Sequence, residues 1–164
     1  MNGAREKIFI CCRIGGTGET DHEKRANFLR NIERAKLYAR WAVLNGYDPE
    51  STGFYFCEFL DDFNPDERKL GQELGRERLK KCDFILVVED GKPHSSDMIG
   101  DIEAARNPGV KPIVITHNEI INWLIKNDSE AFKRMFPELY FEKQRGEGAE
   151  KQRSITYGIF DCYD

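Results

Sequence analysis

A short segment in the middle of the chain, residues 94–103, carries three carboxylates close together. They are Asp97, Asp101 and Glu103. Asp97 and Asp101 are four residues apart, so they would share one face of a helix, whereas Glu103 would point elsewhere. A carboxylate at the mouth of a ligand site can act as a nucleophile or as a general base. The alternative is that acidic residues near a helix N-terminus only interact favourably with the helix dipole.

A second candidate is the glycine-rich loop 12–20, which follows a short apolar run. Because glycine tolerates unusual backbone angles, such a loop lets backbone N–H groups approach an anion. Arg13 could pair with a phosphate or a carboxylate. The glycine spacing matches neither GxGxxG at a helix start nor a P-loop, which argues against a standard dinucleotide site. A plain flexible turn is the alternative.

Three further features are weaker indications. The aromatic stretch 54–60 could stack on a base or close over a pocket, and a core strand or an oligomer contact is the alternative. His94 is the histidine nearest to the carboxylates, but no Ser or Cys partner can be identified for it, so a catalytic triad is not supported. The basic run 76–81 is expected to be a solvated helix face.

Strands and helices are predicted to alternate along the chain, and they would position these residues. Apolar runs predict strands over 7–11, 83–88 and 112–116, with a less clear extended piece at 47–49, and periodic segments predict helices over 23–45, 66–81 and 96–107. This order predicts an α/β fold, a three-layer Rossmann-like or flavodoxin-like domain with a mostly parallel central sheet. In such folds ligands bind outside the carboxyl ends of the strands, which is where both candidate segments would lie.

The rest of the chain is expected to belong to the same single domain, 1–164. The core would span 7–116, and 117–164 would be a helical segment and tail, with helices over 119–126 and 130–136. The polar stretch 142–153 is expected to be a mobile loop, and 154–163 a last short strand or a segment that packs back onto the body.

Composition excludes several classes of protein. The formal net charge is −4 with acids and bases interspersed, which argues against binding nucleic acid through a basic face. No apolar run approaches the roughly 20 residues that span a bilayer, so no membrane association and a cytoplasmic location are expected. The five cysteines are odd in number and lack CxxC or Cys/His metal spacing. We therefore expect reduced thiols, no metal and no cofactor.

The segment Ile8–Gly16 resembles the opening of the nucleoside 2-deoxyribosyltransferase and deoxynucleotide N-glycosidase superfamily. Weaker similarity follows at 31–49 and 59–83, so that the resemblance covers about 7–116 and suggests an uncharacterised branch. In that family a helix-opening pattern carries a catalytic glutamate, and Asp97–Ala105 matches it with Asp101 at the nucleophile position. Glu103 is a second candidate, in a register that fits less well.

The resemblance implies a nucleoside or nucleotide ligand and reaction at its N-glycosidic bond, either by hydrolysis or by deoxyribosyl transfer. It also implies a homodimer or a higher homo-oligomer. The family's supporting tyrosine corresponds to Phe9, and two supporting aspartates correspond to about Gly75 and to Ser95. These departures leave two alternatives open, an inactive nucleotide-binding module and an oligomeric interaction protein. The residues expected to contact the ligand are Cys12, Arg13, Gly15, Gly16, Asp61, His94, Ser95, Ser96 and Met98.

Overall fold

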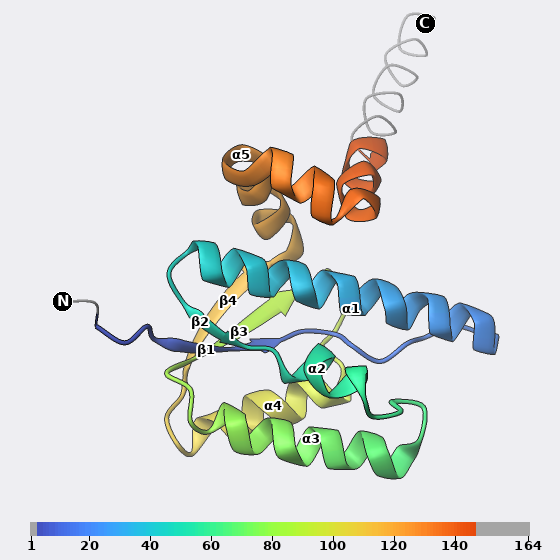
Figure 1. The fold of residues 1–164 in the computed structure, drawn as a ribbon. Helices are drawn as coiled ribbons and strands as arrows, with labels where there is room; N and C mark the ends of the chain where they lie inside the picture. Colours follow the sequence, from blue (N-terminus) through green and yellow to red (C-terminus); the bar gives the residue numbers. More distant parts are fainter. Residues whose placement is uncertain (1–2, 147–164) are drawn as a thin grey trace, which may run out of the picture. The chain divides into compact units, whose positions relative to one another are not determined.

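The computed structural model describes residues 3–146, in which strands and helices alternate (Figure 1). The elements are β1 (Lys7–Cys11), α1 (Asp21–Leu44), β2 (Asp48–Glu50), α2 (Thr52–Tyr55), the 3-10 helix η1 (Phe56–Glu58), α3 (Pro65–Leu79), β3 (Phe84–Glu89), α4 (Ser96–Arg106), β4 (Lys111–Thr116) and α5 (His117–Met135). A further helical stretch follows at 137–146. Two compact units divide within α5: the first reaches Asn122 and the second begins at Trp123.

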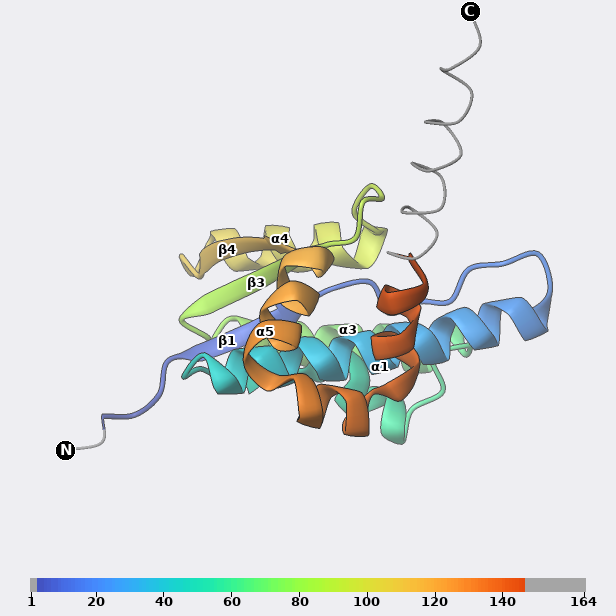
Figure 2. The same cartoon turned by 90° about the horizontal axis from the view of Figure 1, so that it is seen from above.

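The first unit is built on a parallel sheet of four strands in the order β2-β1-β3-β4. Figure 2 shows β1, β3 and β4 side by side. Helix α1 covers one face of the sheet, and α3 and α4 cover the other (Figure 1). The expected three-layer Rossmann-like fold is therefore confirmed. This strand order is that of the flavodoxin-like folds, whose ligands bind at the point between β1 and β3 where the strand order reverses.

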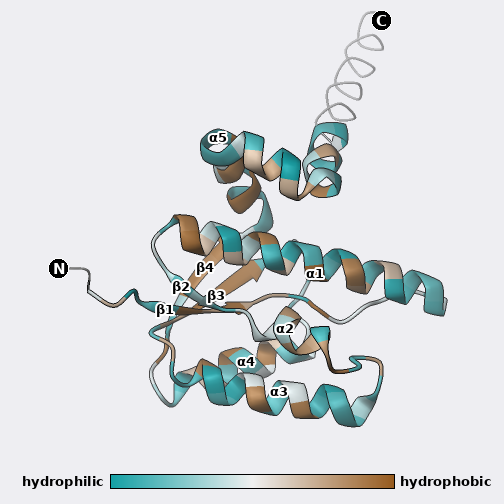
Figure 3. Ribbon diagram, in the orientation of Figure 1, coloured by the Kyte–Doolittle hydropathy of each residue, from teal (hydrophilic) through white to brown (hydrophobic). Residues whose placement is uncertain are grey.

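The core lies on both faces of the two central strands, because their side chains alternate between the faces. Phe9 and Cys11 of β1 and Ile85 and Val87 of β3 belong to a cluster of buried residues under α3 and α4. The residues that alternate with them, such as Ile10 and Leu86, are almost fully buried as well. Figure 3 accordingly shows these strands as hydrophobic, whereas α1 alternates between hydrophilic and hydrophobic residues. No helix within residues 3–146 is both long and apolar enough to cross a membrane.

Helices α1, α3 and α4 each begin at a residue whose side chain accepts hydrogen bonds from the first turn. Thr20 and Glu23 form a capping box at α1, Asn64 caps α3 before Pro65, and Ser95 caps α4. These residues satisfy backbone N–H groups that have no partner within the helix. Since all three helices run antiparallel to the strands, their N-termini gather at the carboxyl edge of the sheet.

Both edge strands carry a proline on their open side. The N–H of Asp48 donates to Glu6 and that of Lys111 donates to Asp83, so these residues face the neighbouring strand. Because the direction of backbone groups alternates along a strand, Pro49 and Pro112 occupy the positions that face away. A proline there removes no hydrogen bond from the sheet.

Two expectations differ from the structure. The aromatic stretch 54–60 is largely helical, in α2 and η1, rather than a core strand. Phe56 is buried, whereas Glu58, which strand alternation would place on the same face, is exposed. The expected loop at 142–153 is helical at 142–146, and the remainder, together with the segment 154–163, lies outside the described residues.

Candidate functional site

Two adjoining cavities open at the carboxyl ends of β1 and β3. The inner cavity encloses about 670 Å³ and the outer cavity about 870 Å³, each including space open to solvent. The inner one lies between β1, α2, α3 and α4, with Phe9, Cys12, Thr52, Phe56, Gln72 and Asp101 among its lining residues. The outer one is lined by the glycine loop, Lys24 of α1 and the start of α4. Asp62, Arg68 and Asp97 line both cavities and form the wall between them.

Arg68 of α3 is the centre of that wall. Its guanidinium pairs with Asp62 through Nη1 and with Asp97 through Nη2. It also lies against Gly15, where a Cβ would come within 3.0 Å of Nη2. Partial burial raises the pKa of Asp62, and the Arg68 charge opposes that rise. The pairing therefore keeps two carboxylates and one cation together where water is partly excluded.

Polar contacts continue from this wall down the interface between α3 and α4. Gln72 Nε2 donates to Asp97 Oδ1 at 2.7 Å, and Arg76 Nε donates to Asp101 Oδ1 at 3.2 Å. Residues 68, 72 and 76 follow one another at four-residue steps and so share one face of α3. We call this row of contacts the α3–α4 ladder.

Asp101 is the carboxylate of the ladder that reaches the inner cavity. Burial raises its pKa to about 6, although Arg76 lowers it and Asp97 raises it further. At neutral pH the group is therefore mostly ionised. Burial, together with the negative charge of Asp101, also raises the pKa of Cys12 to about 12. The Cys12 thiol stays protonated, so Asp101 is the better nucleophile of the two.

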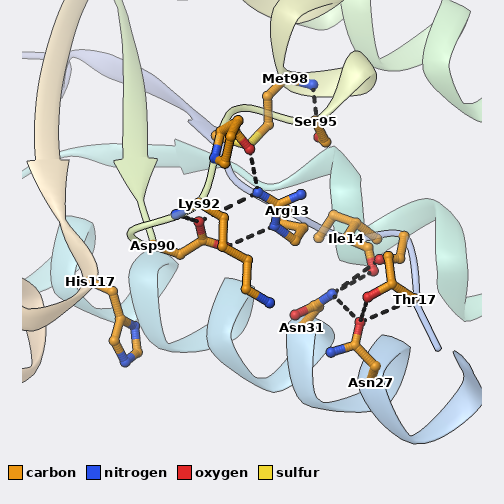
Figure 4. A network of polar contacts seen from close by, with 12 residues as sticks. Arg13, Ile14, Thr17, Asn27, Asn31, Asp90, Lys92, Ser95, Met98 and His117 are labelled. Carbon is orange, nitrogen blue, oxygen red and sulfur yellow. Dashed lines mark hydrogen bonds and ion pairs between the residues drawn. The ribbon is translucent and has the colours of Figure 1, made fainter. Parts of the chain in front are cut away.

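The glycine loop is held from α1 by neutral amide groups, as Figure 4 shows. Asn31 is buried, and its Nδ2 donates to the carbonyls of Ile14 and Gly15, each at 3.2 Å. Asn27 Oδ1 accepts from the Thr17 N–H at 3.0 Å. A Cβ at Gly16 would collide with the Lys24 carbonyl, so the close approach of loop and helix requires glycine there.

Arg13 joins the loop after β1 to the loop after β3 (Figure 4). Its Nε donates to Asp90 Oδ2 at 2.8 Å, and its Nη2 donates to the Pro93 carbonyl at 2.6 Å. Partial burial works against ionisation of Asp90, but the hydrogen bonds from Arg13 and the Lys92 N–H prevail and lower its pKa. Arg13 thus has a structural partner already, while it still lines the outer cavity.

The structure brings most of the expected site residues to the two cavities. Those lining one of them are Cys12, Arg13, Gly15, Gly16, Ser95, Ser96 and Asp101. Four others lie elsewhere. Asp61 accepts from the Phe63 N–H, Met98 is buried in the core, His94 lies 3.5 Å from Glu89, and Glu103 is exposed and pairs with Arg106.

Sequence reasoning missed the side chains that α3 contributes. Arg68 and Gln72 line the inner cavity and Arg76 holds Asp101. The expectation that 76–81 is a solvated helix face is wrong for Arg76, which forms an ion pair with Asp101. The four-residue spacing of Arg68, Gln72 and Arg76 was an available signal, because it matches the spacing of Asp97 and Asp101 on the facing helix.

No group of three or more His, Cys, Asp or Glu side chains that could hold a metal ion occurs in the part of the chain that the structure describes. Cys11, Cys12, Cys57 and Cys82 are free thiols. Residues 6–115 match the model of a family described as "Domain of unknown function (DUF7768)". No curated protein matches the chain.

Proposed function

The chain belongs to the family described as a domain of unknown function (DUF7768), and we propose that it binds a nucleoside or nucleotide and acts on its N-glycosidic bond through Asp101. The observation that carries this proposal is the setting of Asp101. Its carboxylate lines the inner cavity, one oxygen is held by Arg76, and the group is mostly ionised at neutral pH.

The two cavities support a ligand with an apolar part and an anionic part. The inner cavity has aromatic and aliphatic walls, such as Phe9, Ile14 and Phe56, which suit a base and a sugar ring. The outer cavity has Arg13 and Lys24 in its lining, with Ser95 at the N-terminus of α4, which suits a phosphate.

The reaction follows the course of a retaining glycosidase. Asp101 Oδ2 attacks the anomeric carbon, the bond from that carbon to the base nitrogen breaks, and the electron pair leaves with the base. The base takes a proton from solvent, and the sugar remains as an ester on Asp101. Water then attacks the same carbon, the ester bond breaks with its electron pair returning to Asp101, and the water proton goes to solvent. A second base in place of water gives transfer.

A binding module without turnover is the second candidate. It is favoured by Phe9, which lines the inner cavity without a hydroxyl that could assist Asp101. Both candidates would bind the same ligands, but only the enzyme would release free base or transfer the sugar.

The test is release of free base from a panel of ribo- and deoxyribonucleosides and their 5′-monophosphates, followed by chromatography. Asp101→Asn removes the nucleophile with little change of shape and should abolish release. Glu103→Gln is the matched control, because it neutralises an exposed carboxylate on the same helix. If the wild type releases base and Asp101→Asn still does so, the role of Asp101 is contradicted. No release, together with thermal stabilisation by a panel member, would establish the binding module instead.

A further inference from the structure

We propose that Arg76 is a positioning residue for Asp101, and that Gly100 keeps open the space that the Arg76 guanidinium occupies. This inference rests on the proposed function in one respect, that Asp101 is the group that reacts. The contact itself and its effect on Asp101 can be tested without any turnover.

Arg76 acts on Asp101 and not on a ligand in either cavity. Its Nε donates to Asp101 Oδ1 at 3.2 Å. Among the described residues, Arg76 does not line the inner or the outer cavity, whereas Asp101 lines the inner one. Asp101 accepts no other hydrogen bond from residues 3–146. One oxygen of the carboxylate is therefore fixed from behind, and Oδ2 remains for the reacting carbon.

Gly100 explains how a long side chain can reach that oxygen. A Cβ at Gly100 would overlap Arg76 Nη2 and lie 2.8 Å from Cζ. The guanidinium therefore crosses α4 directly over this glycine. Glycine inside a helix costs about 1 kcal/mol of stability relative to alanine. The room that the Arg76 side chain needs explains why position 100 is a glycine despite this cost.

The other arginines of α3 are placed differently. Arg68 is shared between Asp62 and Asp97 and lines both cavities, so it is a candidate for ligand contact. Arg78 turns away: its guanidinium lies 5.0 Å from the ring centres of Tyr55 and Phe56. Arg78→Gln is thus a matched control that removes the same charge from the same helix without touching Asp101.

The physical role follows from charge and direction. A cation within hydrogen-bond distance favours the ionised carboxylate, and the Arg76 N–H restrains the oxygen that it contacts. The titratable groups around Asp101 are Asp97 on its own helix and Cys11 and Cys12 at the end of β1. Asp97 is negative and the thiols are neutral, so Arg76 is the cation in contact with Asp101.

The first measurement is the titration of Asp101 by carboxyl NMR in full-length protein. Arg76→Gln should raise the Asp101 pKa from about 6 by about one unit. Gly100→Ala should raise it in the same direction, Arg76→Lys should raise it less, and Arg78→Gln should leave it unchanged. Thermal unfolding of each variant checks that it is folded. If the Asp101 pKa is unchanged in folded Arg76→Gln, the proposal is wrong. If the Asp101 pKa is unchanged in folded Gly100→Ala, the role given to the glycine is wrong.

The second measurement is base release. Arg76→Gln should lower kcat by about a hundredfold with KM changed little, and the acidic limb of the pH profile should move with the NMR titration. Arg76→Lys should recover part of the rate. A rise in KM with kcat unchanged would overturn positioning in favour of ligand binding. If the titration shifts as expected but the wild type releases no base, the contact stands and the proposed function is what fails.

Discussion

The two sides of the site are held together by different forces. On one side, the glycine loop is fixed to α1 by the neutral amides of Asn31 and Asn27. On the other, α3 and α4 are joined by ion pairs through Arg68 and Arg76. Amides do not titrate, so the contacts between the glycine loop and α1 should be the same at any pH at which the protein is folded. The α3–α4 ladder contains carboxylates and should respond to pH.

The loop side offers the largest expected effect on stability. Asn31→Leu removes the Nδ2 amide that contacts the carbonyls of Ile14 and Gly15 and the Asn27 Oδ1, and it leaves partly buried carbonyls without that donor, which should cost about 3 kcal/mol of unfolding free energy. Urea unfolding at about pH 7.5 and pH 4.5 should give the same loss, because no ionisable group is involved. Glu33→Gln, on the exposed face of α1, is the control. A loss that depends strongly on pH would contradict the contrast between the two sides.

Arg68→Gln should have a smaller effect that does depend on pH. Without the cation, the pKa of Asp62, already raised by burial, rises further above its unfolded value. The resulting cost is present above the folded-state pKa and absent below the unfolded one. We expect a loss of about 2 kcal/mol at about pH 7.5 that shrinks towards pH 4, as measured by urea unfolding. An equal loss at both values would mean that Arg68 acts by packing alone.

Asp101→Asn should stabilise the protein. The folded-state pKa of about 6 lies above the ordinary value of 3.8 for an aspartate. The folded chain therefore binds the proton more tightly, and ionising Asp101 costs stability that is absent below about pH 4 and fully present above about pH 6. An amide avoids this cost, so we expect a gain of about 1–2 kcal/mol at about pH 8 and little change at pH 4. A less stable variant at pH 8 would mean that the ion pair with Arg76 outweighs burial.

Glu103→Gln should have the smallest effect. The Glu103 side chain is 70% exposed and pairs with Arg106 one turn away at 3.2 Å, an arrangement that contributes less than about 0.5 kcal/mol. Melting temperature and base release should both stay within error of the wild type. A marked loss of base release would move the reactive carboxylate from Asp101 to Glu103.

Local pattern was enough to predict most of the fold. The run at 7–11 coincides with β1, and the ranges predicted for the strands at 83–88 and 112–116 differ by one residue from β3 and β4. Buried parallel strands are continuous apolar runs, which makes them easy to find. β2 was harder to predict because it pairs with β1 over three residues only, Asp48–Glu50, and these are two acids on either side of a proline.

The candidate site was predicted on the strand side and missed on the helix side. Parallel strands place their following loops at one edge, so Gly15, Gly16 and Ser95 could be brought together from topology. Arg68 and Arg76 are on α3, and the only signal that their face meets α4 was a four-residue spacing that matches the spacing of Asp97 and Asp101. The pairing of Arg76 with Asp101 depends on Gly100, which leaves room for the Arg76 guanidinium over α4.

The prolines on both edges of the sheet have a consequence for encounters between copies of this chain. An exposed strand edge is a template on which another molecule can add a strand, and repeated addition leads to fibrils. Pro49 and Pro112 interrupt the row of donors that such growth would need. If copies of this chain associate through the described residues, 3–146, they should therefore do so through side-chain surfaces rather than by adding a strand to either edge of the sheet.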